Sequence, residues 1–245
     1  MSFVDSHLHL DSRDVDELMG FAEATGTMLF ACGIDRKTSE QVLSLRTKHP
    51  KTVRPFVGVH PSEALKGRDL RWFGPSLDKA AGAGEIGLDP TYSPTGERSA
   101  QREVLRRQLE VAQNRGKPVQ VHSRNAEQEC LEVLGTFNLG NVLMHWLEDE
   151  AALAHASERG YYVSFSPALL YSGRLQRMAR RSDPDLVLAE SDSPVSYGPL
   201  GGVHGPSLVP SVIYKLSELW GKPFDDTLAA TASNAVRFIG SAGKG

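Results

Sequence analysis

The 245-residue sequence has few cysteines, no large excess of charge of one sign and no long apolar run. Its two cysteines, Cys32 and Cys130, lie far apart, which argues against a disulfide framework and fits a reducing compartment. Lysine and arginine number 27 against 30 aspartate and glutamate, a formal net charge of −3. This balance argues against a protein that coats nucleic acid through bulk positive charge.

Further absences bear on where the protein works and how many domains it has. No run approaches the ~18 apolar residues of a membrane span, and residues 1–5 lack the basic and apolar regions of a secretory leader. We therefore expect a cytoplasmic protein without membrane contact. No linker divides the chain, so we expect one domain over residues 1–240 and a frayed tail at 241–245.

Short apolar runs alternate with segments that carry apolar residues at helical spacing. Strands separated by helices indicate parallel pairing through right-handed crossovers. Eight such units favour a single-domain (β/α)8 TIM barrel with extra C-terminal helices, and a doubly wound open sheet is the main alternative. The expected strands are 3–7, 28–31, 53–59, 84–88, 119–122, 142–145, 161–165 and 186–190, followed by helices near 209–220 and 228–239.

Histidines and acidic residues fall where these strands end. The carboxyl ends of barrel strands converge on one face, so these side chains are expected to meet there. The i, i+2 spacing of His7 and His9 points both imidazoles to the same side of an extended segment. Neutral imidazoles with carboxylates indicate a divalent metal site. The strand-end set is His7, His9, His60, Glu85, His122, His145 and Asp192.

Each of these residues alone has an ordinary structural explanation, such as a satisfied polar group or a helix cap. If these polar groups clustered at the carboxyl end of the barrel (its mouth) without a ligand, however, their desolvation would cost much free energy. This favours the joint interpretation as a metal site. Three other histidines are set apart. His49 is expected at an exposed helix end and His155 on an outer helix face, while the orientation of His204 in its loop stays open.

The motifs resemble those of the TatD-type metal-dependent hydrolases, often called TatD DNases, within the amidohydrolase-like barrels. The most specific signals are Gly-Glu-Ile-Gly-Leu-Asp at 84–89 and Asp-Ser-Pro at 192–194. The resemblance covers nearly the whole chain and implies a distorted TIM barrel that hydrolyses phosphodiester bonds in DNA or a related substrate. The other matching segments are 5–9, 58–61, 118–124, His145 and 233–237.

The resemblance further implies divalent metal ions, and about two would be expected of a site that activates a bridging water. Zn²⁺, Mn²⁺ or Co²⁺ suits such ligands and Mg²⁺ prefers more oxygen, so the metal stays open. The implied ligands are His7, His9 and Asp192 for one ion and His122 and His145 for the second, with Glu85 as the bridge.

Catalytic and substrate-binding roles follow. Asp192 is a candidate to take the proton from the attacking water, and Glu85 serves the reaction through the ions that it bridges. By the resemblance, His60 would contact the scissile phosphate. Arg124 follows the fifth strand and is expected to point into the mouth, where a guanidinium fits phosphate oxygens.

The segments around the site add further expectations. Asp5 and Glu190 are candidates to orient ligand imidazoles. The arginine-rich run at 174–181 is interpreted as a solvated helix face. Residues 145–149, His-Trp-Leu-Glu-Asp, and 202–206, Gly-Val-His-Gly-Pro, depart from the usual TatD pattern in loops that would shape the substrate cleft.

Three functions are compatible with this site. The leading hypothesis is a deoxyribonuclease or other phosphodiesterase that binds its substrate at the barrel mouth and needs no obligate protein partner. The alternative is an amide, ester or lactone hydrolase of a small molecule. Related barrels of that kind often use a carboxylated lysine, and Glu85 at the corresponding place favours the phosphodiesterase. A non-enzymatic metal-binding scaffold is the third hypothesis, and the full ligand set makes it the weakest.

Overall fold

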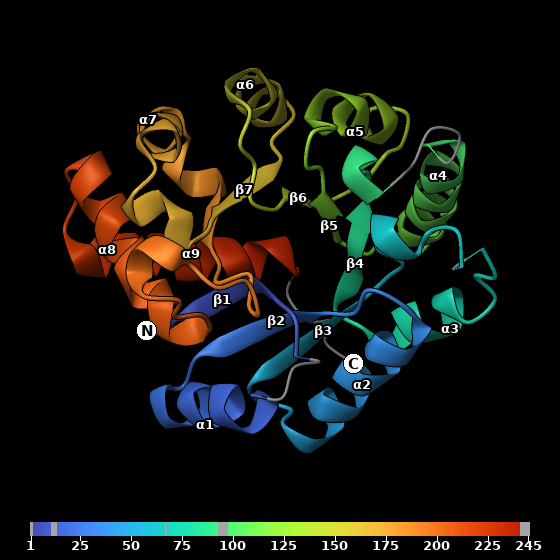
Figure 1. The fold of residues 1–245 in the computed structure, drawn as a ribbon, viewed down its shortest axis with the longest axis horizontal. Helices are drawn as coiled ribbons and strands as arrows, with labels where there is room; N and C mark the ends of the chain where they lie inside the picture. Colours follow the sequence, from blue (N-terminus) through green and yellow to red (C-terminus); the bar gives the residue numbers. More distant parts are fainter. Residues whose placement is uncertain (1, 11–13, 67, 93–97, 241–245) are drawn as a thin grey trace.

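The computed structural model describes residues 2–10, 14–66, 68–92 and 98–240. Eight parallel strands pair in sequence order and helices surround them, which confirms the expected barrel (Figure 1). The strands are β1 (Val4–Leu8), β2 (Met28–Cys32), β3 (Val53–Val57), β4 (Gly82–Gly87), β5 (Val119–His122), β6 (Val142–Met144), β7 (Tyr162–Phe165) and β8 (Val187–Ala189).

Each strand leads into helical structure, and two helices follow β8, as the sequence pattern predicts. The helices are α1 (Val15–Thr25), α2 (Arg36–Lys48), α3 (Phe73–Lys79), α4 (Arg98–Asn114), α5 (Glu127–Leu134), α6 (Glu150–Glu158), α7 (Gly173–Arg181), α8 (Val209–Trp220) and α9 (Phe224–Phe238).

The two ends of the sheet meet where the segment that follows β8 runs beside the carboxyl end of β1. The Asp192 N–H donates to the His7 carbonyl at 3.0 Å, and the His9 N–H donates to the Ser193 carbonyl at 2.7 Å. The barrel is therefore closed by the same segments that carry three of the expected metal ligands, and closure fixes their relative positions.

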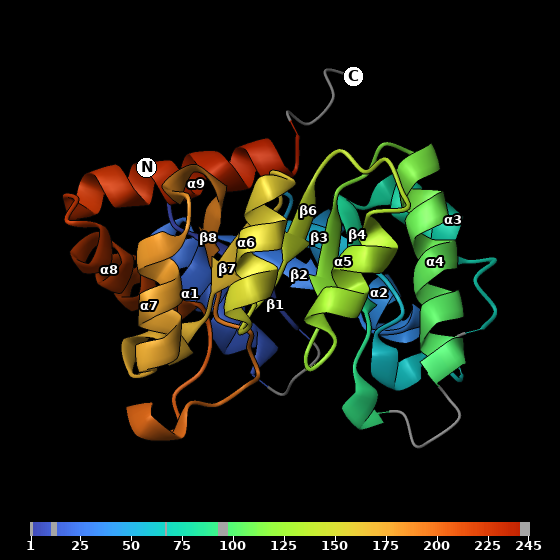
Figure 2. The same cartoon turned by 90° about the horizontal axis from the view of Figure 1, so that it is seen from above.

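Helix α9 covers the opposite, amino end of the barrel (Figure 2). The Asn234 side chain donates to the Val187 carbonyl at 2.7 Å, and Asn141 donates to the Phe238 carbonyl at 2.8 Å. Val187 begins β8 and Asn141 directly precedes β6, so these bonds anchor the helix to the strand starts.

Aromatic rings from three strands and from α9 pack together toward the amino end of the barrel. The ring of Phe56 lies 5.6 Å from Phe30 and 5.9 Å from Phe238, between centroids, and Tyr162 lies 5.5 Å from Phe238. The three phenylalanines are fully buried, and burying each contributes about 2–3 kcal/mol. This apolar cluster occupies the amino end of the barrel, and the polar residues lie at the carboxyl end.

Two strand boundaries differ from the sequence expectation by two residues, and the others that differ do so by one residue. β3 ends at Val57 and not at residue 59, because the backbone of Val59 bonds the Gln108 side chain of α4, at 2.7 Å and 3.1 Å. β4 begins two residues before the expected Gly84, because Gly82 pairs with Phe56 of β3.

No helix within the described ranges is long and apolar enough to cross a membrane. The tail at 241–245, expected to be frayed, lies outside the described residues, and the domain limits of 1–240 stay a prediction.

Candidate metal centre

The carboxyl end of the barrel holds a cavity of about 730 Å³, lined by residues from the loops after most of the strands. His7 lies just beneath it and is fully buried. The structure thus brings all of the strand-end set to one place. The residues of that set that line the cavity are His9, His60, Glu85, His122, His145 and Asp192, joined by Arg124.

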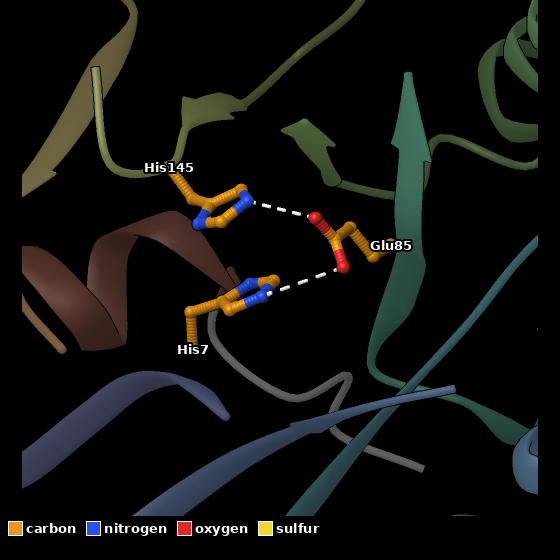
Figure 3. Close-up of side chains that lie close together, drawn as sticks. All are labelled: His7, Glu85 and His145. Carbon is orange, nitrogen blue, oxygen red and sulfur yellow. Dashed lines mark hydrogen bonds and ion pairs between the residues drawn. The ribbon is translucent and has the colours of Figure 1, made fainter. Parts of the chain in front are cut away.

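The carboxylate of Glu85 lies at the centre of the cluster. Its Oε1 atom is 2.7 Å from His122 Nδ1 and 2.8 Å from His145 Nε2. Its Oε2 atom is 3.2 Å from His9 Nε2 and 3.7 Å from His7 Nε2. Figure 3 shows Glu85, from β4, facing both His7 and His145, whose rings lie one over the other. One carboxylate therefore faces two groups of imidazoles, one group on each oxygen.

A glycine in the Gly-Glu-Ile-Gly-Leu-Asp motif allows this approach. Gly87 has a φ of +156°, and a Cβ atom there would lie 1.9 Å from the His122 carbonyl oxygen. β4 and β5 can therefore run close enough for Glu85 to reach His122 only with glycine at position 87.

Hydrogen bonds fix the tautomers of His7 and His9. Nδ1 of His7 donates to the Gln120 side-chain oxygen at 2.7 Å, and Nδ1 of His9 donates to the Cys32 carbonyl at 3.0 Å. Because these acceptors hold the Nδ1 protons, the Nε2 atoms of both rings point their lone pairs at the carboxylates when neutral. Gln120 was missed in the sequence, although its i, i+2 spacing from His122 places both on one side of β5.

His60 has the opposite arrangement. The Ser62 N–H donates to His60 Nδ1 at 3.2 Å, which leaves the proton of the neutral ring on Nε2. Nε2 lies 3.7 Å from Glu85 Oε1. Burial lowers the pKa of His60 to about 3, so the ring is neutral at physiological pH and offers an N–H donor to the cavity.

Asp89, the last residue of the same motif, joins His122 to Arg124. Its Oδ2 atom lies 2.9 Å from His122 Nε2 and accepts from Arg124 Nε at 2.8 Å. Arg124 Nη2 also donates to Thr91 at 2.6 Å. These contacts use two of the five N–H groups of the guanidinium and hold it at the cavity wall. The sequence analysis quoted Asp89 within the motif without giving it a role.

Glu190 and Asp5 lie behind the cluster. Glu190 Oε1 is 3.6 Å from His145 Nδ1, and its Oε2 accepts from Ser164 at 2.5 Å, so it faces the imidazole of His145, one of the expected ligands. Asp5, the other candidate, makes backbone contacts. Its carboxylate accepts from the N–H groups of Ser191, at 2.9 Å, and His7, at 3.4 Å, where β8 closes on β1.

The acidic residues hold protons on several imidazoles. Burial lowers the pKa of His9, but the hydrogen bond and charge of Glu85 outweigh this and raise it to about 9. Burial has the same effect on His145, and Glu85 and Glu190 raise its pKa well above the usual range. Burial and the charge of His145 lower the pKa of His7. Burial alone would raise the pKa of Glu85, but His60, His145 and His122 hold it well below its usual value.

The donor set fits a divalent cation. Within the described part of the chain, the buried His7 Nε2 atom has no hydrogen-bond partner, yet it lies 3.6 Å from Asp192 Oδ1 and 3.7 Å from Glu85 Oε2. Ligands about 2.1 Å from a tetrahedral ion are separated by roughly 3.4 Å. A cation would also replace the protons that the carboxylates now attract. The groups with atoms close enough to share an ion are His7–Glu85–His145, His7–His9–Asp192 and His60–Glu85–His122.

The other histidines lie apart from this cluster. His49 follows α2 and pairs with Glu23 at 2.6 Å, and His155 lies on α6, where Arg159 donates to it at 3.1 Å. His204, whose orientation the sequence left open, contacts Ser193 at 3.2 Å and therefore supports the loop that carries Asp192.

The model of the family described as "TatD related DNase" matches residues 4–240. The chain belongs to the TatD related DNase family. It is 28% identical to human "Deoxyribonuclease TATDN3", over 98% of this chain and 95% of the human protein. It is 30% identical to mouse "Putative deoxyribonuclease TATDN3", over 79% of this chain and 73% of the mouse protein.

The crystal structure of YJJV, a TatD homologue from Escherichia coli, superposes on this TatD-family barrel with a TM-score of 0.87. The two chains are 21% identical and the match covers 98% of each, so this likeness concerns the fold. The family and the barrel expected from the sequence are thus confirmed.

Proposed function

We propose that this chain is a divalent-metal-dependent phosphodiesterase that cleaves DNA. The observation that carries the proposal is the position of Glu85, whose two oxygens face separate groups of imidazoles in a cavity that Arg124 also lines. Membership of the TatD related DNase family and the likeness to the human deoxyribonuclease support the same substrate class.

The imidazole ligands are assigned to two ions according to the oxygen of Glu85 that they face. His7, His9 and Asp192 would hold one ion, consistent with the lone pairs that Gln120 and Cys32 direct into the cluster. Glu85 would bridge to a second ion held by His122 and His145. Bound ions would activate a water molecule and neutralise charge on a phosphoryl oxygen. The N and O donors suit Zn²⁺, Mn²⁺ or Co²⁺ better than Mg²⁺, which prefers more oxygen ligands.

The side chains around the ligands complete the proposed reaction. Asp192 would receive the proton that the attacking water loses, since its carboxylate lines the cavity beside His7. The Nε2–H of His60 would donate to a phosphate oxygen, a role that its tautomer favours over metal ligation. Arg124 would bind a second phosphate oxygen with the N–H groups that Asp89 and Thr91 leave over.

One panel of assays tests this function. Purified protein loaded with Mn²⁺, Zn²⁺ or Mg²⁺ is given bis-p-nitrophenyl phosphate, a single-stranded oligonucleotide and a set of carboxylic esters. We expect phosphodiester turnover that His122→Ala abolishes and His155→Ala, a surface control, leaves intact. Ester turnover without any phosphodiester turnover would instead establish the small-molecule hydrolase.

A further inference from the structure

One wall of the cavity is built from side chains that the metal assignment does not use. Trp146 directly follows His145, and its indole Nε1 donates to Glu148 Oε1 at 3.2 Å. The other oxygen of Glu148 accepts from Arg174 Nη2 at 2.6 Å. Trp146, Glu148 and Arg174 all line the cavity, and we call these three residues the Trp146 wall. Arg174, expected on a solvated helix face, is half exposed but belongs to this wall.

The indole of Trp146 is held from several sides. Its ring lies 5.9 Å from that of Tyr197, which is buried, and its backbone N–H donates to Ser164 at 3.3 Å. Trp146 has a φ of +40°, a conformation that bulky residues rarely adopt. Such strained residues persist where the surroundings over-determine them, and they gather at ligand sites. The position of the indole is therefore fixed, and its ring offers a rigid aromatic surface to the cavity.

The charge of the wall indicates what it can bind. Arg174 and Glu148 neutralise each other, so the wall does not supply a net positive charge for a second phosphate. An aromatic surface beside a phosphate site suits a nucleobase, because every base can stack on it whatever its sequence. Another aromatic, Tyr92, also lines the cavity, where the Arg124 guanidinium lies 5.2 Å from its ring.

We infer that Trp146 stacks on the base of a nucleotide joined to the scissile phosphate, a contact that any of the bases can make. The inference rests on the proposed phosphodiesterase activity and names a substrate-binding residue of that same site. Trp146 lies in a segment where this chain departs from the usual TatD pattern, so the family resemblance does not imply this contact.

The test compares substrates that differ only in one base. The metal-loaded protein is given a 5′-labelled single-stranded oligothymidylate and two analogues that lack the base on one or the other side of the linkage cleaved first. The variants are Trp146→Gly, which relieves the positive φ, and Trp146→Phe, which keeps an aromatic ring. Trp220→Phe, in α8 and bonded to the Ala179 carbonyl at 2.8 Å, is the matched control.

We expect wild type to cleave the complete oligonucleotide about 10- to 100-fold faster than one abasic analogue, by kcat/KM. Trp146→Gly should lose that preference, while Trp146→Phe and Trp220→Phe keep it. An equal slowing of all three substrates by Trp146→Gly, or an unchanged preference, would overturn the inference. If wild type cleaves the oligonucleotides without preference, the inference fails and the proposed function stands. If wild type cleaves no phosphodiester, both fail.

Discussion

The side-chain oxygen of Gln120 accepts a hydrogen bond from Nδ1 of His7 at 2.7 Å. The same oxygen accepts from the Cys32 thiol at 3.2 Å, so the amide is oriented by two donors. Gln120 therefore holds the His7 ring with its Nε2 lone pair toward Glu85 and Asp192. Partners of this kind are as much a part of a metal site as the ligands that they orient.

Gln120→Met should weaken metal binding by about 10- to 100-fold, because it keeps the side-chain volume but removes the acceptor for His7. Isothermal titration calorimetry with Zn²⁺ or Mn²⁺ measures the change. Asn234→Leu is the control, since it also removes a buried amide, but at the amino end of the barrel. It should lower the free energy of unfolding and leave metal affinity unchanged. Equal metal affinity in Gln120→Met and wild type would refute the orienting role.

Arg124→Ala should lower kcat/KM for a phosphodiester by about 10²-fold, since it removes a charge-assisted contact to phosphate worth about 1.5–3 kcal/mol. Metal content should not change, because Asp89 keeps its contact to His122. The control is Arg177→Ala, another exposed arginine, which pairs with Glu150 on the barrel exterior. Kinetics and metal analysis of both variants test the assignment, which an unaltered kcat/KM in Arg124→Ala would exclude.

Asp192→Asn should lower kcat by about 10²- to 10⁴-fold even when metal is bound, because the amide can still offer an oxygen but accepts no proton. Turnover is measured at metal concentrations that saturate the variant, with occupancy checked by mass spectrometry. Asp183→Asn, at an exposed turn before β8, is the control. Full turnover of the metal-bound Asp192→Asn variant would show that another group takes the proton.

Asp5 makes the metal-free protein sensitive to pH. Burial raises the pKa of its carboxyl from 3.8 to about 7. Between these values the native state keeps a proton that the unfolded chain has released, so the free energy of unfolding falls as pH rises. At 1.36 kcal/mol per pKa unit the loss is at most about 4 kcal/mol between pH 4 and pH 7.

Asp5→Asn cannot ionise and should escape this loss, while its side-chain oxygen still accepts from Ser191 and His7. Urea unfolding of both proteins in EDTA, from pH 4.5 to 8, gives the difference between their free energies of unfolding. The variant should gain stability relative to wild type as pH rises. A difference that does not depend on pH would mean that Asp5 has an ordinary pKa in the native state.

The sequence predicted the barrel and the convergence of the candidate ligands for the same physical reason. Parallel strands end on one face, so histidines near the strand ends had to converge there, and the structure brings Glu85 of β4 among them. Contacts within the interior were harder to foresee. Gln120 has a visible signal in its spacing from His122, but whether that side of β5 faces the lumen is decided by closure of the barrel.

The conformations of the loops could not be predicted from the sequence pattern. The positive φ of Trp146, the approach of Arg174 to the cavity and the turn that brings Asp89 to His122 and Arg124 all depend on tertiary contacts. Asp5 shows the same limit. It was a candidate to orient a ligand imidazole, whereas its carboxylate accepts from the backbone of Ser191 and His7 where β8 closes on β1.

The most direct test of the account is the metal content and phosphodiester turnover of Glu85→Ala, measured on the same preparation. Wild type should bind about two ions per chain and lose turnover when they are removed with EDTA. Glu85→Ala should lose both bound metal and turnover, while Glu132→Ala, on the exposed side of α5, keeps both. A Glu85→Ala protein with wild-type metal content and wild-type turnover would contradict the proposal that this carboxylate joins two metal sites.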